Sequence, residues 1–128
     1  MINLLKKDKL KIFNDKRGSL FFFQNNYSKI ERVFFIKGKK GMSRGNHAHK
    51  KTRQILININ AKAKISIIRE NEKEISFSKK GDLINLPKLT WIKINFLSDG
   101  FIAVICDKKY LKSDYINNFK KFKKLHLK

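Results

Sequence analysis

Apolar and polar side chains alternate along the middle of the chain. Every second position is apolar in four segments, residues 54–60, 62–67, 74–78 and 92–96. Successive side chains of a β-strand point to opposite faces of a sheet, so a period of two predicts strands with one buried face. The segments RVFFI (32–36) and FIAVIC (101–106) are nearly all apolar, which is typical of strands covered on both faces.

Turn-forming sequences separate these segments: IKGKKG, RENEK, KKGD and LSDG. Many short strands at this spacing favour an all-β fold, either a sandwich or an antiparallel barrel. The end of the chain differs, because apolar residues at 115, 116, 119 and 122 have helical spacing, with Ser113 or Asp114 available as the N-cap. We therefore predict a short C-terminal helix and then a basic tail, about residues 123–128.

The length and the cysteine content indicate one small domain. The chain has 128 residues, which fits a single core over residues 1–128. Its one cysteine, Cys106, lies in an apolar segment and is interpreted as a small core residue. No stretch approaches the length of a membrane span, and the N-terminus has no cleavage signature. We expect no membrane partner and a cytoplasmic location.

The charge is strongly positive, with 31 Lys and Arg against 10 Asp and Glu and a net charge of +21. Taken alone, this charge suggests a nucleic acid or another polyanion as partner. Arginine, which readers of phosphate and bases favour, is rare, and the lysines are spread along the whole chain. A nucleic-acid partner is therefore not expected, but the field would favour small anionic substrates such as phosphate esters.

Two histidines, His47 and His49, stand one residue apart in the sequence RGNHAHK. In an extended segment both imidazoles point to the same face, which in a barrel can be the interior. Such a pair can form half of a metal site, or can transfer protons itself, since imidazole titrates near neutral pH. The simplest alternative is a pair of hydrogen-bonded core histidines.

The spacing around these histidines resembles the two motifs of the cupin superfamily. Five residues separate Gly41 from His47, and GDLINLP (81–87) matches the start of the second motif. Metal-binding cupins have a glutamate where this chain has Gln54 and a histidine where it has Ile92. Two imidazoles and a neutral amide make a weak donor set, so we expect no metal and no other cofactor.

A closer resemblance joins five segments: DKRGSL, ERVFFI, RGNHAHKKTRQIL, NLPKLTW and DKKYLKSDYI. Together they resemble the nucleotide-sugar 3,4-ketoisomerases, bacterial cupins that act on dTDP-4-keto-6-deoxyglucose. The resemblance spans roughly Phe13 to Phe122. It implies a cupin-type antiparallel β-barrel (jelly roll) and an isomerase of deoxyamino-sugar biosynthesis, in pathways to surface glycans such as lipopolysaccharide O-antigen.

The resemblance also implies chemistry. The ketone moves from C4 to C3 through an enediol or enediolate, which needs a base, an acid and a donor for the developing oxyanion. By motif position, His49 is the main carbon acid/base, His47 is its partner, and Arg44 is an electrostatic stabiliser or substrate clamp. The order of the two histidines stays open.

The resemblance gives weaker indications for substrate binding. The candidates are Arg17, Arg32, Lys50, Gln54, Trp91 and Tyr110. The alternative for Lys50 is a solvated side chain, and the alternative for Trp91 is a core residue. The two arginines are candidates for contact with the nucleotide or with another subunit. Family members often carry a tyrosine on the strand matching RVFFI, where this chain has Phe34 and Phe35, so Tyr110 is a candidate replacement.

The apolar N-terminal stretch from LKIF to LFFF is long for so small a domain and suggests burial against a second copy. The resemblance likewise implies a homodimer, either with or without an exchange of N-terminal strands between the subunits. Two other functions stay open. One is a non-catalytic cupin that binds a nucleotide sugar. The other is a polyanion-binding protein that uses Phe21, Phe22, Phe23 and the basic tail.

Overall fold

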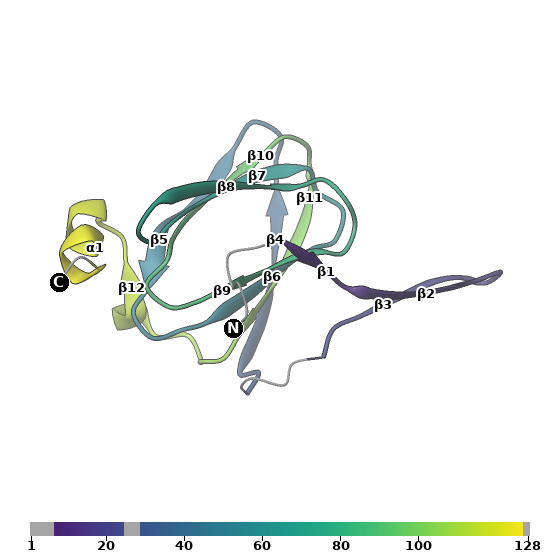
Figure 1. Cartoon of the computed structure of the whole chain (residues 1–128), viewed down its shortest axis with the longest axis horizontal. Helices are drawn as coiled ribbons and strands as arrows, with labels where there is room; N and C mark the ends of the chain where they lie inside the picture. Colours follow the sequence, from purple (N-terminus) through teal and green to yellow (C-terminus); the bar gives the residue numbers. More distant parts are fainter. Residues whose placement is uncertain (1–6, 25–28, 127–128) are drawn as a thin grey trace.

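The computed structural model describes residues 7–24 and 29–126, and in them two five-stranded antiparallel sheets face each other (Figure 1). The first sheet contains, in spatial order, β1 (Asp8–Lys9), β9 (Asp82–Leu86), β6 (Gln54–Asn58), β11 (Gly100–Cys106) and β4 (Arg32–Gly38). The second contains β12 (Tyr115–Ile116), β5 (Ser43–His49), β10 (Trp91–Phe96), β7 (Ala63–Ile68) and β8 (Glu72–Phe77).

Three smaller elements complete the described chain: the hairpin β2 (Lys11–Asp15) and β3 (Gly18–Phe22), the 3-10 turn η1 (Lys112–Asp114) and the helix α1 (Phe119–His126). The prediction of an all-β jelly-roll fold with a short C-terminal helix is confirmed. The barrel is not closed, however, because the two sheets remain separate hydrogen-bonded units. The molecule is therefore a jelly-roll-like sandwich with an opening between the sheet edges.

The main core lies between the two sheets and follows the alternation seen in the sequence. Its buried side chains include Leu56, Ile65, Ile67, Phe77, Ile84, Phe96, Ile102 and Val104. Gly38 allows the sheets to meet closely, because a Cβ atom there would lie 2.3 Å from the ring of Phe96. The period of two thus built the inner face of the second sheet as expected, whereas in β6 it is Leu56, and not the alternating isoleucines, that faces this core.

The outer face of the first sheet is also partly covered. Ile55 and Ile57 of β6 and Ala103 of β11 form a second cluster, against which Leu10 and Phe23 pack. Consequently all five residues of β6 are buried, although their sequence alternates like that of a half-exposed strand. The strand β4 is less covered than expected. Its sequence predicted burial on both faces, but Val33 and Phe35 are 51% and 64% exposed.

The predicted start of the C-terminal helix is wrong. Tyr115 and Ile116 are extended and pair with His49 and Ala48 of β5, and α1 begins only at Phe119. The side chain of Asn118 accepts a hydrogen bond from the amide of Lys121 (3.0 Å) and so caps the helix in place of Ser113 or Asp114. The helix continues to His126, so most of the basic tail is helical rather than frayed, and residues 127–128 lie outside the described chain.

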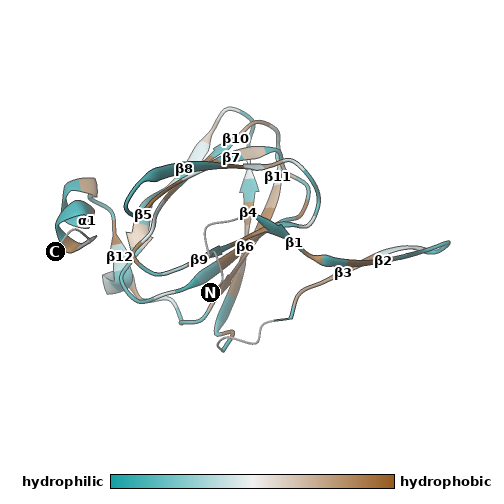
Figure 2. Cartoon of the chain, in the orientation of Figure 1, coloured by the Kyte–Doolittle hydropathy of each residue, from teal (hydrophilic) through white to brown (hydrophobic). Residues whose placement is uncertain are grey.

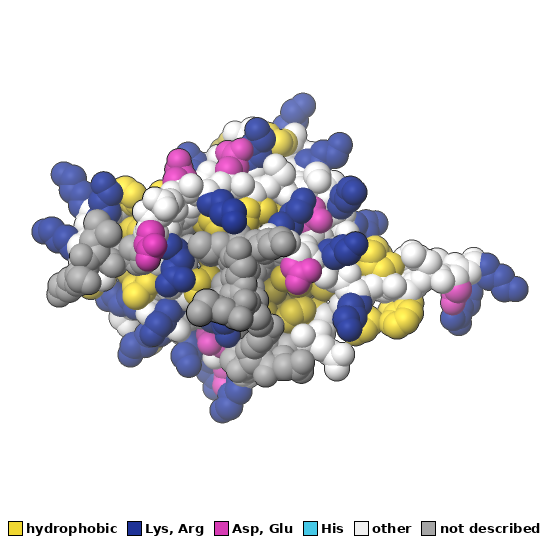
Figure 3. All heavy atoms as spheres, viewed as in Figure 1, with side chains coloured by type: hydrophobic (Ala, Val, Ile, Leu, Met, Phe, Trp, Pro, Cys, Tyr) yellow, Lys and Arg dark blue, Asp and Glu magenta, His cyan; other side chains and the backbone are white. Residues whose placement is uncertain are grey.

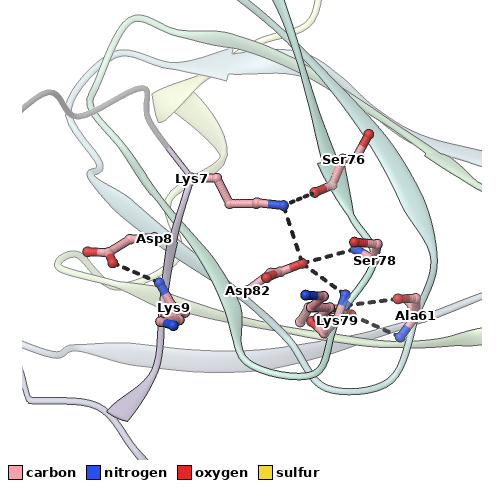
Figure 4. A network of polar contacts seen from close by, with 9 residues as sticks. Lys7, Asp8, Lys9, Ala61, Ser76, Ser78, Lys79 and Asp82 are labelled. Carbon is pink, nitrogen blue, oxygen red and sulfur yellow. Dashed lines mark hydrogen bonds and ion pairs between the residues drawn. The ribbon is translucent and has the colours of Figure 1, made fainter.

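A polar network fastens β1 to the body (Figure 4). The buried carboxylate of Asp82 accepts hydrogen bonds from the amides of Ser78 and Lys79 (3.0 and 2.9 Å) and forms an ion pair with Lys7 (3.8 Å). Beyond β1, the hairpin β2–β3 projects away from the sandwich, on the side opposite α1 (Figure 1). Figure 2 shows that the base of this projecting hairpin is apolar.

Candidate active site

A cavity of about 310 Å³ lies between the sheets, next to the strands β4 and β5. Much of its wall is apolar: Phe34, Phe35, Ile36, Leu56, Ile92, Ile94 and Val104. Its polar lining residues are Arg44 and His47 of β5, Gln54 of β6 and Tyr115 of β12. A small apolar cavity with a few convergent polar groups is the usual form of a small-molecule site.

A β-bulge turns the side chains of β5 into this cavity. In a regular strand Arg44 and His47, three positions apart, would face opposite sides of the sheet. The register with β10 shifts between Ile92 and Lys93, which pair with His47 and Gly45, so one extra residue is inserted in β5. Gly45 has φ of +99°, and a Cβ there would lie 2.7 Å from the carbonyl oxygen of Ile92, so this position needs glycine.

Behind the cavity, His49 is held by Asp114. The Nδ1 atom of His49 lies 2.9 Å from Oδ2 of Asp114, and both side chains are buried. The same carboxylate accepts hydrogen bonds from the hydroxyl of Thr52 (2.5 Å) and the amide of Lys51 (2.7 Å). Burial opposes the charge of Asp114, but the bonds from Thr52, His49 and Lys51 outweigh it and lower its pKa. An ionised Asp114 only accepts, so Nδ1 of His49 carries the proton and Nε2 is the basic nitrogen.

Both histidines are held in the neutral form near pH 7. Burial, and secondarily the neighbouring His49, lower the pKa of His47 to about 4. Burial also lowers the pKa of His49, although Asp114 acts in the opposite direction. Nδ1 of His47 and Nε2 of His49 are buried and have no hydrogen-bond partner among the described residues. Two uncharged imidazoles with free nitrogen atoms can accept or return a proton.

The two imidazoles share a third neighbour, Tyr115. Its ring centroid lies 4.4 Å from that of His49 and 5.2 Å from that of His47, and the two imidazole centroids are 5.2 Å apart. The pairing of β12 with β5 causes this arrangement, because it places Tyr115 opposite His49. Tyr115 and Asp114 were not predicted as site residues. The motif-like segment DKKYLKSDYI contains both, but no local pattern shows that it folds back onto β5.

Arg32 stands next to this cluster. Its guanidinium lies 5.4 Å from the ring centroid of Phe34 and 5.6 Å from that of Tyr110, and its Nη2 is 3.4 Å from Sγ of Cys106. Burial, the largest influence on its pKa, opposes the charge of Arg32, but Cys106 and Tyr115 outweigh it and raise the pKa. Arg32 is therefore a fixed positive charge at the edge of the histidine cluster.

The structure brings together some of the predicted site residues and separates others. His47, Arg44 and Gln54 line the cavity, and His49 lies directly behind it. The amide nitrogen of the Gln54 side chain lies 3.4 Å from Sγ of Cys106, which orients it. Lys50 lies just past the end of β5, where its amide donates to the carbonyl of Asp114 (2.8 Å), and it does not line the cavity.

Three further candidates lie outside the cavity. Trp91 is buried against Phe119 and Phe122 of α1, as a core residue would be. Tyr110 is 62% exposed and lines a neighbouring cavity of about 500 Å³, together with Lys51 and other residues. Arg17 lies at the turn of the projecting hairpin, ion-paired with Asp15 (2.6 Å). Figure 1 shows that the hairpin β2–β3, whose turn contains Arg17, projects away from β5, the strand of the histidines.

The donor set for a metal is sparse. In residues 7–24 and 29–126, no three His, Cys, Asp or Glu side chains lie close enough together to bind one ion. At the second cupin ligand position, Ile92 contributes only a buried hydrocarbon side chain to the cavity wall. The expectation of a metal-independent reaction rests on this donor chemistry and stays a prediction.

Comparison with known proteins identifies the family. The model of the FdtA family, described as WxcM-like, C-terminal, matches residues 4–126. The chain belongs to the FdtA family. A curated relative of this FdtA-family chain is the TDP-4-oxo-6-deoxy-alpha-D-glucose-3,4-oxoisomerase of Aneurinibacillus thermoaerophilus, which is 32% identical over 116 residues, covering 86% of this chain and 84% of the relative.

Solved structures agree with this family membership. A 3,4-ketoisomerase from Helicobacter canadensis has a TM-score of 0.89 and 26% identity, covering 96% of the FdtA-family chain and 97% of its own. The sugar 3,4-ketoisomerase QdtA from Thermoanaerobacterium thermosaccharolyticum, solved with TDP, has a TM-score of 0.88 and 28% identity, covering 99% of the FdtA-family chain and 97% of its own.

Among the described residues of the FdtA-family chain, no helix is both long and apolar enough to cross a membrane.

The low pKa of His47 predicts acid sensitivity. The unfolded chain binds a proton at this residue below about pH 6.5, whereas the folded chain does so only near pH 4. The unfolded state therefore binds more protons in this window, and the free energy of unfolding should fall by on the order of 2 to 3 kcal/mol from pH 6.5 to 4. Urea unfolding at several pH values measures it. A His47→Gln variant should show a shallower fall, and an equal fall would contradict the assignment.

Proposed function

We propose that this protein is a TDP-sugar 3,4-ketoisomerase, which moves the ketone of TDP-4-keto-6-deoxyglucose from C4 to C3. The observation that carries the proposal is the pair of neutral imidazoles at a small cavity, His47 half-buried and His49 buried, in a chain that resembles the curated 3,4-oxoisomerase over most of its length. A cytoplasmic location and a role in deoxyamino-sugar synthesis for surface glycans remain part of the proposal.

The cavity lining favours His47 as the carbon acid/base. His47 lines the cavity, whereas His49 lies behind it with only 2% of its surface exposed. In the proposed reaction, a neutral His47 takes the proton from C3 and returns it to C4. The ring centroid of His49, which is held by Asp114, lies 5.2 Å from that of His47. This pair acts as the partner of His47: it restricts the movement of the His47 ring and shares the positive charge that His47 gains with the proton. This order reverses the one preferred from motif position.

Arg44 is proposed to stabilise the oxyanion or to clamp the diphosphate. It extends from the bulge in β5 into the cavity mouth and is exposed, so it can reach a substrate that enters from solvent. A guanidinium suits both tasks, because it keeps its charge and forms two parallel hydrogen bonds with phosphate or enediolate oxygens. Gln54, held by Cys106, is proposed to hydrogen-bond the sugar.

A single assay tests the proposed function. The protein is incubated with TDP-4-keto-6-deoxyglucose in deuterated buffer, and proton NMR follows the 3-keto product and hydrogen exchange at C3. We expect product formation without added metal or nucleotide cofactor, and no loss of rate after treatment with a chelator. The absence of both product formation and exchange at C3 would refute the function. Binding of TDP without turnover would indicate a non-catalytic relative.

A homodimer is the second part of the proposal. Phe13 and Leu20 are cross-strand partners on the projecting hairpin and are 63% and 61% exposed. Val33 and Phe35 are exposed on β4, which is an edge strand of its sheet. Two exposed apolar surfaces on so small a protein indicate contact with another copy. A hairpin that docks on the partner subunit, whether or not N-terminal strands are swapped, would carry its Arg17 to that partner.

Oligomeric state tests the dimer. We expect light scattering after gel filtration to give twice the chain mass for the wild type and the chain mass for a Phe13→Ser/Leu20→Ser variant, because the hairpin surface loses its apolar contacts. Leu97→Ser, in the turn after β10, removes a similarly exposed apolar side chain and should leave the dimer intact. A monomeric wild type would contradict the proposal.

The basic composition supports a polyanion partner less than the cavity and its histidines support an enzyme. On the face shown in Figure 3, Lys and Arg are scattered over the whole surface rather than gathered in one patch. Of the three phenylalanines at 21–23, Phe23 packs against the outer face of the first sheet and Phe22 stacks on Phe13 (5.6 Å between centroids), so these rings are already engaged within the chain.

A further inference from the structure

The proposed reaction needs two proton transfers, and the histidines explain one of them. The hydrogen on C3 must move to C4, which a single imidazole can achieve. The hydroxyl proton on O3 must also be lost while the former carbonyl oxygen O4 gains one. O3 and O4 are neighbours on the sugar, so one hydroxyl group placed beside both can donate to O4 and accept from O3.

Tyr115 is placed to supply that hydroxyl group. It lines the cavity together with His47 and Arg44, and its ring touches both imidazoles, with centroids 5.2 Å from His47 and 4.4 Å from His49. Its backbone is fixed by pairing with β5, and the residue before it, Asp114, holds His49. One short segment therefore positions both the basic imidazole pair and a phenol.

Arg32 provides a charge that would stabilise the phenolate formed in such a transfer. The electrostatic interaction with Tyr115 is one of those that favour the charged form of Arg32. The guanidinium is itself fixed between the rings of Phe34 and Tyr110 and by Cys106. A positive charge held in a partly buried position stabilises a transient anion more than one in water.

We propose that Tyr115 is a catalytic residue that shuttles a proton from O3 to O4 of the sugar, with Arg32 as its positioning charge. The proposal rests on the ketoisomerase function proposed above. As His47 takes the C3 proton, the Tyr115 hydroxyl gives its proton to O4, and an enediol forms. The Tyr115 phenolate then takes the proton of O3 while His47 returns its proton to C4. Both side chains end in their starting forms, and no oxidant or reductant is consumed.

The other tyrosine near the site is less well placed. Tyr110, which the sequence suggested, is mostly exposed, lies 5.7 Å from Tyr115 between ring centroids and does not line the histidine cavity. Phe34 does line the cavity but has no hydroxyl group. Among the described residues, the phenol that contacts both histidines is therefore that of Tyr115.

Tyr115→Phe tests the proposal, because it removes one oxygen atom and keeps the ring. We expect the formation of the 3-keto sugar to fall about 10²-fold or more, whereas deuterium exchange at C3 falls less than about tenfold, since His47 still removes that proton and Arg44 still stabilises the oxyanion on O4. Tyr110→Phe, the alternative suggested by the sequence, should give the smaller loss of product formation. TDP should raise the melting temperature of both variants as it does that of the wild type.

Three results would overturn the assignment. Product formation by Tyr115→Phe within threefold of the wild type would exclude a shuttle, and a larger loss in Tyr110→Phe would move the role to that residue. An equal loss of exchange, product formation and TDP stabilisation would indicate a purely structural role. Failure of the function itself is distinct, because then the wild type shows neither product nor exchange.

Discussion

Replacing His47 by asparagine should lower the rate of ketone transfer by about 10³-fold, within the range expected for loss of a general acid/base. The amide keeps a polar side chain in the cavity but cannot take up a carbon-bound proton. His47 reaches the cavity, and its pKa of about 4 leaves it neutral and able to act as a base at pH 7. Product formation and C3 exchange, both followed by NMR, should fall together.

Two measurements control this experiment. Stabilisation by TDP should be retained, which shows that the variant is folded and binds nucleotide. The parallel His49→Asn variant should be slower than the wild type but faster than His47→Asn, because His49 lies behind the cavity. The opposite order would return the role of carbon acid/base to His49, as the motif position suggested.

Asp114→Asn should reduce both stability and rate. The carboxylate accepts hydrogen bonds from His49, Thr52 and the Lys51 amide, and an amide group cannot accept all three. We expect a loss of about 2 to 4 kcal/mol in the free energy of unfolding, because buried donors that now bond to a charged acceptor are left without a partner. The rate per folded molecule should fall about 10²-fold, since His49 is no longer held in one tautomer.

Asp82→Asn is the matched control for that variant. Asp82 is also a buried carboxylate that accepts hydrogen bonds from two backbone amides and pairs with a lysine, but it lies at the start of β9 and does not line the cavity. The Asp82→Asn substitution should lower the free energy of unfolding and leave the rate per folded molecule unchanged. If Asp114→Asn behaves like Asp82→Asn, with lost stability and a normal rate, then Asp114 supports the fold and does not act through His49.

The sequence predicted the strands well where only the face toward the other sheet is buried. The alternation in β7, β8 and β10 reflects a single inner face, and those strands form as expected. β4 and β6 were misjudged because their outer faces depend on distant segments. Phe23 and Leu10 cover β6, whereas Val33 and Phe35 of β4 remain 51% and 64% exposed. Local periodicity contains no information on which segment will lie over a sheet.

The site was predicted in part for a similar reason. Arg44, His47, His49 and Gln54 lie within eleven consecutive positions, so a motif could indicate them together. Asp114 lies 65 residues beyond His49, and the two-residue strand that follows it brings Tyr115 to β5. The spacing of Tyr115 and Ile116 to Phe119 and Phe122 fitted a helix equally well, and only the capping side chain of Asn118 marked the true boundary.

The arrangement of the cavity wall has a stereochemical consequence. The histidines and Tyr115 come from the adjacent strands β5 and β12 of the second sheet, whereas Leu56 and Val104 present hydrocarbon from β6 and β11 of the first sheet. A sugar ring in this cavity would meet groups able to transfer hydrogen along one side only. Departure of hydrogen from the first carbon and its delivery to the second would then be suprafacial, and a tritium label could pass between the two carbons without leaving the protein.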